Sequence, residues 1–103
     1  NGEYEMAIKI LIESPWADDD DHKIELAMCY RFQKEYKQAL KILNSMERRK
    51  ALHELGILHE AIGKVDQAID YMNEFLDEYP YADPELKKIR TAKEFIEKWK
   101  NRS

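Results

Sequence analysis

The sequence predicts an all-α fold of antiparallel helical hairpins stacked on one another. Three observations predict this fold. Only three glycines and three prolines occur in 103 residues, and they lie near the ends of periodic segments. Between them, apolar residues recur at the spacing of one helical face. The third observation is an internal repeat, which is in register on Ala7, Ala39 and Ala68.

The three alanines share the same neighbours. A branched aliphatic residue follows each one, a large apolar residue stands four positions later, and a bulky residue stands three positions earlier. In order, these are Ile8, Leu40 and Ile69, then Leu11, Leu43 and Met72, then Tyr4, Tyr36 and Val65. Because neither helix of a hairpin buries its apolar stripe alone, we expect the hairpins to stack and share a core.

The third unit shows both stripes of a hairpin. Its first helix is expected to pack through Leu52, Leu55, Gly56 and His59, which fall at i, i+3, i+4 and i+7. Gly56 is small, as is Ala27 in the unit before, so that the partner helix can approach closely. The second helix answers with Val65, Ala68, Met72 and Phe75.

The stretch ALHELGILHEAIGKVDQAIDYMNEFLDEYP (residues 51–80) resembles a nearly complete tetratricopeptide repeat, and the resemblance covers essentially the whole chain. The alanine spacings are 32 and 29 residues, shorter than the family period of about 34. The resemblance implies a right-handed superhelix with a capping helix at its end. It also implies a concave surface, lined by the first helix of each hairpin, that holds segments of partner proteins.

The expected organisation is a single domain over residues 1–103 with four parts. Residues 1–14 are the second helix of a truncated repeat, 20–47 and 48–80 are repeats, and 84–101 form a capping helix. The first part lacks its own first helix, so we expect the parent protein to extend N-terminally. Without that helix, the apolar stripe formed by Ile8, Leu11 and Ile12 has no natural neighbour.

The shortened junction lies between Leu43 and Leu52. Asn44 is expected to end one helix and Ser45 to cap the next. In the capping helix, Arg90 occupies the position of Gly56, where a bulky charge would obstruct a following hairpin. The residues of that helix expected to face inward are Leu86, Ile89, Ala92, Ile96 and Trp99.

The sequence predicts no catalytic residue, no metal site and no cofactor, so the chain is expected not to be an enzyme. The run from Asp18 to Asp21 lacks the spacing and glycine of a calcium loop and fits a helix N-terminus. His53 and His59 are six positions apart rather than the four of a zinc pair, and His59 is expected in the core. Cys29, the only cysteine, excludes an intrachain disulfide and is expected to be an inert thiol on the outer face.

The predicted site is a partner-binding groove on the inner face of the first helices. Ile24, Met28 and Ile57 are apolar at positions outside the predicted core faces, which favours an apolar peptide or helix as the ligand. Single exposed apolar residues, or cover by an N-terminal element, remain the alternative. The predicted groove comprises Ile24, Met28, Arg31, Lys50, His53, Ile57, Glu60, Lys87 and Thr91.

The expected partner is a protein or peptide, bound by a scaffold or adaptor module. Residues 1–84 carry 10 basic and 18 acidic side chains, which disfavours nucleic acid as the main partner. No apolar run is long enough for direct membrane insertion. The alternative function is self-assembly, through the open N-terminal half-repeat or through the basic residues 85–103. The cytoplasm and the bacterial periplasm both remain open as compartments.

Overall fold

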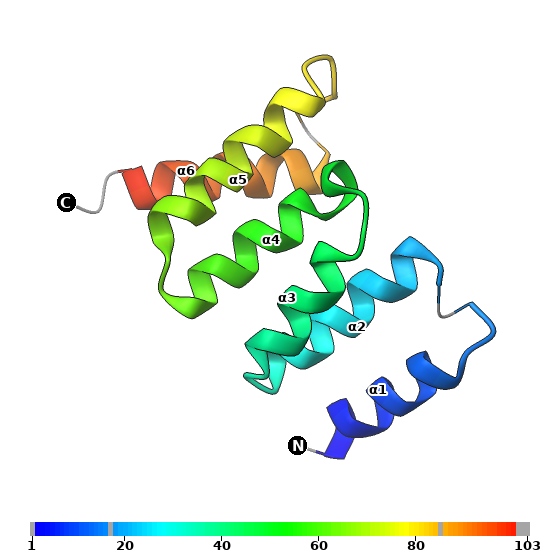
Figure 1. Ribbon diagram of the computed structural model, residues 1–103. Coiled ribbons are helices and arrows are strands. Elements are labelled where there is room, and N and C mark those ends of the chain that lie inside the picture. Colours follow the sequence, from blue (N-terminus) through cyan, green and yellow to red (C-terminus); the bar gives the residue numbers. More distant parts are fainter. Residues whose placement is uncertain (1, 17, 85, 101–103) are drawn as a thin grey trace.

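The computed structural model describes residues 2–16, 18–84 and 86–100, and these residues form six α-helices and no strand (Figure 1). The predicted all-α class is therefore confirmed. The helices are α1 (Gly2–Glu13), α2 (Asp20–Phe32), α3 (Tyr36–Asn44), α4 (Arg48–Ile62), α5 (Val65–Glu78) and α6 (Lys87–Lys100).

Short turns join α2 to α3 and α4 to α5, and each turn uses one left-handed residue. Lys34 has a φ of 64° in the first turn, and Gly63 has a φ of 95° in the second. At the second turn the Lys64 amide donates to the His59 carbonyl at 2.8 Å, which satisfies an orphan carbonyl at the end of α4. Connections this short make each pair an antiparallel hairpin.

The α4–α5 hairpin packs as its register predicts. All four expected positions of α4 are buried, and so are Ala68, Met72 and Phe75 on α5. A Cβ atom at Gly56 would lie 2.8 Å from Met72 Cε, so the small residue is needed for the close approach of the two helices. The predicted roles of Gly56 and of the buried His59 are confirmed.

Helix α4 is buried on two sides because it lies between two hydrophobic cores. The N-terminal core consists of Ala27, Ala39, Leu43, Met46, Ala51, Leu55 and Leu58. The C-terminal core consists of Leu52, Met72, Phe75, Ile89 and Ala92. Figure 1 shows the matching arrangement, with α2 and α3 on one side of α4 and α5 and α6 on the other.

The predicted junction is half right. Helix α3 ends at Asn44, as expected, but Ser45 does not cap α4. The Ser45 hydroxyl instead donates to the Ile42 carbonyl at 2.6 Å, and Glu47 stands at the start of α4 without a capping bond from its side chain. The physical reason is Met46, which is buried in the N-terminal core and so determines the path of the connection.

Two further expectations at the ends need correction. Leu86 does not face inward: it precedes α6 and is 55% exposed, whereas Ile89 and Ala92 are buried as predicted. Ile8 is not left without a neighbour, because it is buried where α1 packs on α2. Its companion Ile12 does remain largely exposed.

Candidate partner-binding surfaces

The predicted groove residues lie on α2, α4 and the start of α6, but they do not form one open strip. Lys50 and Lys87 are exposed, and His53 is buried. The other six are half-buried, namely Ile24, Met28, Arg31, Ile57, Glu60 and Thr91.

The apolar strip was predicted because Ile24, Met28 and Ile57 were expected to lie outside the core, and this expectation is wrong for two of the three. Ile24 packs against the N-terminal core, and Ile57 packs against the C-terminal core. Sequence spacing alone missed these contacts because helices beyond the hairpin partner also cover α2 and α4: α2 packs against α4 as well as α3, and α4 lies between the two cores. Met28 differs, since it lines a groove between α1 and α2.

His53 is not available on a free inner face, because it is only 8% exposed and its ring packs edge-on to Phe75 at 5.1 Å. Within the described residues, neither ring nitrogen has a hydrogen-bond partner. Burial, with a smaller contribution from the nearby Lys88 ammonium, lowers the pKa of His53 from 6.5 to about 4. The ring is therefore neutral near pH 7, and we infer a packing role.

We expect this histidine to make the fold sensitive to acid. Because its pKa falls from 6.5 in the unfolded chain to about 4 in the fold, its neutral form is favoured on folding. The free energy of unfolding is therefore unaffected by His53 above pH 6.5 and declines as the pH falls toward 4. The expected decline is about 1–2 kcal/mol after discounting for partial solvation of the ring. Urea titrations at several pH values should show a shallower acid-side slope for His53→Leu. Equal slopes in both proteins would contradict the prediction.

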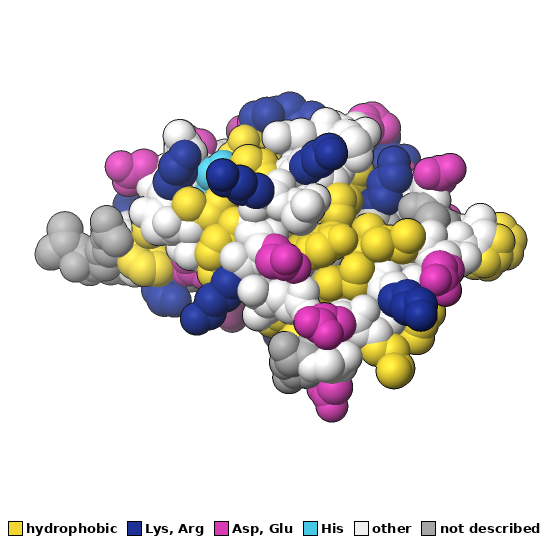
Figure 2. Space-filling view, turned by 60° about the horizontal axis from the view of Figure 1, so that its bottom comes forward, with side chains coloured by type: hydrophobic (Ala, Val, Ile, Leu, Met, Phe, Trp, Pro, Cys, Tyr) yellow, Lys and Arg dark blue, Asp and Glu magenta, His cyan; other side chains and the backbone are white. Residues whose placement is uncertain are grey.

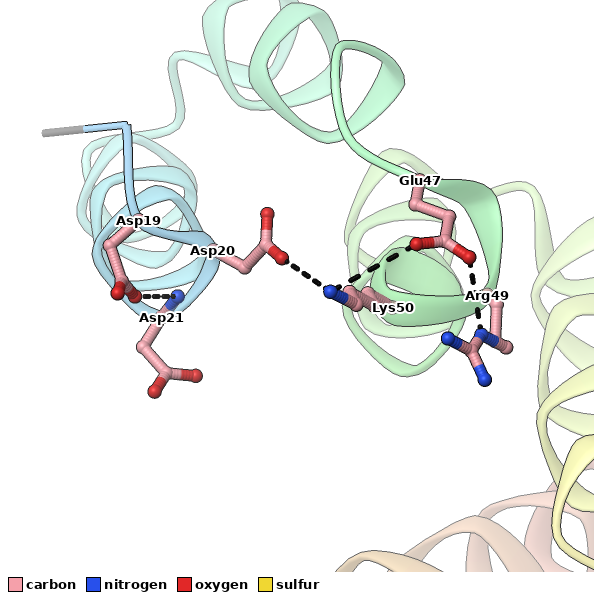
Figure 3. Close-up of polar contacts among 6 residues, drawn as sticks. All are labelled: Asp19, Asp20, Asp21, Glu47, Arg49 and Lys50. Atoms are coloured by element: carbon pink, nitrogen blue, oxygen red, sulfur yellow. Dashed lines mark hydrogen bonds and ion pairs between the residues drawn. The ribbon is translucent and has the colours of Figure 1, made fainter.

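Lys50 connects the start of α4 to the start of α2 (Figure 3). Its ammonium lies 2.9 Å from an Asp20 carboxylate oxygen and 3.9 Å from Glu47. This hydrogen bond and charge pairing raise the pKa of Lys50 and lower that of Asp20. Beside the pair, Ile24 and Lys50 line a cavity of about 380 Å³, together with Asp19, Asp20, Asp21, Tyr79 and Lys88.

The acidic run does contribute a helix cap. Asp19 is the N-cap of α2, and its carboxylate accepts a hydrogen bond from the Asp21 amide at 2.8 Å (Figure 3). Among the described residues, no group of three or more His, Cys, Asp or Glu side chains could hold a metal ion.

Removing this cap should weaken α2. Asp19→Ala is expected to lower the free energy of unfolding by about 1 kcal/mol, because the Asp21 amide loses its acceptor. The neighbouring exposed Asp18→Ala is the matched control, since both variants remove one negative charge near the same helix start. If thermal or urea unfolding finds the two variants equally stable, the effect is charge alone rather than the capping bond.

Glu60 is engaged by α6 rather than open to solvent. The Trp99 indole Nε1 donates to a Glu60 carboxylate oxygen, and Lys98 Nζ lies 3.7 Å from the same oxygen. These contacts attach the end of α4 to the end of α6. They also occupy a carboxylate oxygen of Glu60 that could otherwise accept a hydrogen bond from a ligand.

An apolar hollow lies between α1 and α2, away from the centre of the predicted groove. It measures about 370 Å³ and its lining includes Met28. Figure 2 shows the side of the molecule that lies at the bottom of Figure 1, where α1 is. On this side, hydrophobic side chains gather in one area among charged ones. We call this hollow the α1–α2 groove; the other residues lining it are Tyr4, Ala7, Ile10, Leu11, Glu25, Cys29 and Phe32.

Sequence reasoning missed most of this groove, although the repeat register contained the signal. Ala7 and Leu11 are in register with Ala39 and Leu43, which are buried, so their exposure could have been predicted where no first helix packs on α1. Cys29 is not on an outer face as expected, because it lines the groove and is half-buried. Burial, with a smaller contribution from Glu25, raises the pKa of its thiol, which keeps it protonated and unreactive.

Comparison with known protein families matches residues 50–80 to the tetratricopeptide repeat. Comparison with curated proteins and with solved structures found no significant match. The described part of the chain contains no helix long and apolar enough to cross a membrane. The matched segment contains nearly all of α4 and the whole of α5, the hairpin with the complete buried stripes. The segment 50–80 of this chain is therefore similar to a tetratricopeptide repeat.

Proposed function

We propose that this protein is an interaction module that holds an apolar peptide or helix of a partner protein in the α1–α2 groove. Tetratricopeptide repeats are in general protein-interaction modules and non-enzymatic scaffolds. The observation that carries the proposal is the lining of the groove, where seven of the eight side chains are apolar, including Ile10 at 62% exposed. Exposed apolar surface of this kind marks interaction sites in soluble proteins.

The inner face of α2, α4 and α6 is expected to add polar contacts at the edge of such a complex. Its exposed members are Lys50 and Lys87, and Arg31 and Thr91 are half-buried. Met28 is the predicted residue that belongs to the α1–α2 groove itself. An Ile57→Glu variant would mainly report on stability, because Ile57 packs against the C-terminal core.

The chain offers a matched pair of variants for testing the groove. Ile10 and Ile12 are both exposed residues of α1, at 62% and 54%, but only Ile10 is among the residues that line the groove. Partners captured by the wild-type chain should be lost with Ile10→Glu and retained with Ile12→Glu, with circular dichroism showing that both variants fold. Equal retention by the two variants would refute the proposed site.

The second candidate function is self-assembly, which the charge distribution favours. Residues 1–84 carry 10 basic and 18 acidic side chains, whereas residues 85–103 carry 7 basic and 3 acidic ones. Attraction between the basic end of one copy and the acidic body of another should be strongest at low salt. Sedimentation velocity at low and high salt tests this, and a monomer at all concentrations in low salt would eliminate it.

We further propose the repeat organisation that the resemblance implies. Residues 20–47 and 48–80 would act as two repeats of a right-handed superhelix, residues 1–14 as the second helix of a truncated repeat, and 84–101 as the capping helix. The antiparallel α2–α3 and α4–α5 hairpins support this division. Residues 1, 85 and 101 lie outside the described residues. A crystal structure with a left-handed hairpin stack would overturn it.

A further inference from the structure

Helix α4 carries a buried carboxylate that accepts no hydrogen bond from any described residue. This carboxylate belongs to Glu54, which is only 8% exposed and forms no ion pair with a described residue. Burial raises the pKa of Glu54, and the positive charges of Arg31 on α2 and Lys88 on α6 offset part of this effect. Because a buried carboxylate is costly without hydrogen-bond donors, Glu54 is a candidate acceptor for a bound group.

Arg31 provides an unused donor on the neighbouring helix. Helix α2 packs against α4, and the charge of Arg31 is the larger of the two positive charges that act on Glu54. The Arg31 Nε atom is buried and has no hydrogen-bond partner among the described residues. The guanidinium carbon lies 4.6 Å from the centre of the Phe32 ring, a contact that holds the group in place. An unpaired donor and an unpaired acceptor therefore lie within electrostatic reach of each other without bonding.

This pair selects a neutral ligand group that both donates and accepts a hydrogen bond. A cation could pair with Glu54, but it would leave the Arg31 Nε–H unpaired and would be repelled by Arg31 and Lys88. An anion would leave Glu54 unpaired and would be repelled by it. A backbone peptide group has both functions, but its N–H and C=O point in opposite directions because the bond is trans. A primary carboxamide presents an N–H donor and a C=O acceptor at one edge.

We propose that the inner face between α2 and α4 binds a primary carboxamide, the side-chain group of asparagine and glutamine in a partner protein. The carboxamide N–H donates to the Glu54 carboxylate, and the carboxamide oxygen accepts from Arg31 Nε. His53 extends this polar surface, because both of its ring nitrogens lack a partner among the described residues. The site is separate from the α1–α2 groove and does not depend on what that groove binds.

Four small probes of similar size separate the possible ligand groups. Propionamide is a primary carboxamide, N-methylacetamide is a trans peptide group, propionate is an anion and propylammonium is a cation. In nitrogen–proton NMR spectra of the labelled chain, propionamide should shift the Arg31 Nε–H signal and the Glu54 backbone amide saturably, in the millimolar range. Each of the other probes should bind at least about tenfold more weakly, because it leaves Arg31 or Glu54 unpaired.

An isosteric variant tests whether Glu54 is the acceptor. Glu54→Gln should abolish the shifts caused by propionamide, because its own carboxamide can accept from Arg31 Nε and take the place of the ligand. Glu94→Gln makes the same change at an exposed carboxylate of α6 and should leave these shifts unchanged. Circular dichroism checks that both variants fold.

The outcomes also identify the ligand class if the inference is wrong. No saturable shift with propionamide, an equal response to all four probes, or full binding by Glu54→Gln would overturn it. A stronger response to propionate would assign an anion site, and a stronger response to propylammonium a cation site, and either result would overturn it as well. None of these results bears on the comparison of Ile10→Glu with Ile12→Glu, so failure here is distinguishable from failure of the α1–α2 groove.

Discussion

Replacing Leu52 with alanine is expected to lower the free energy of unfolding by about 3–4 kcal/mol. Leu52 is 0% exposed and belongs to the C-terminal core with Met72 and Ile89, which come from two other helices. Truncation leaves a cavity where α4, α5 and α6 meet, and none of the three can close it without losing contacts elsewhere. Urea denaturation followed by circular dichroism at 222 nm measures the loss.

Leu86→Ala is the control for this change, because Leu86 is the same residue type but is 55% exposed. Its loss should be below about 1 kcal/mol, since little apolar surface returns to water. Similar losses in the two variants would mean that the C-terminal core does not carry the stability assigned to it. Such a result would also question the docking of α6 onto the α4–α5 hairpin.

Gly56→Leu is expected to destabilise the protein by about 2–3 kcal/mol, and this cost should depend on Met72. A Cβ atom added at residue 56 would lie 2.8 Å from Met72 Cε and 3.1 Å from its Cγ, and leucine adds three more carbon atoms beyond it. Gly56→Ala should be close to neutral. Its contact with the flexible end of Met72 is offset by the gain of about 1 kcal/mol in helix propensity.

A double-mutant cycle tests the cause of this cost. Met72→Ala alone removes a fully buried side chain and should cost about 2–5 kcal/mol. In the Gly56→Leu background the same change should cost much less, because the new leucine fills the space that the methionine leaves. Additive losses in the double variant would show that the cost of the leucine does not arise from its contact with Met72.

Much of the hairpin architecture was predictable because it depends on local rules. The stripe from Leu52 to His59 follows the helical period, and Gly63 provides the left-handed turn between α4 and α5. The failures occurred where one long-range contact competes with a local preference. Ser45 is a good N-cap by residue type, but burial of Met46 directs the connection elsewhere.

The candidate site was less predictable than the fold. The prediction of an inner face assumed that each first helix buries one stripe. Helix α4 is instead buried on two sides, so its residues Ile57 and His53 are covered by neighbouring helices. The α1–α2 groove depends on which faces remain uncovered after all the helices have packed. That property belongs to the whole arrangement, so residues such as Ile10 and Phe32 carried no local signal.

By itself, the sequence determined the helical class, the hairpin register, the close approach at Gly56 and the similarity of residues 50–80 to a tetratricopeptide repeat, because each depends on residue spacing along one or two adjacent helices. The tertiary structure alone decided that His53 is buried, that Glu60 is held by α6, and that the apolar hollow lies between α1 and α2. The physical reason is that burial is set by every element packed around a side chain. The periodicity of a single helix records only the nearest of those elements.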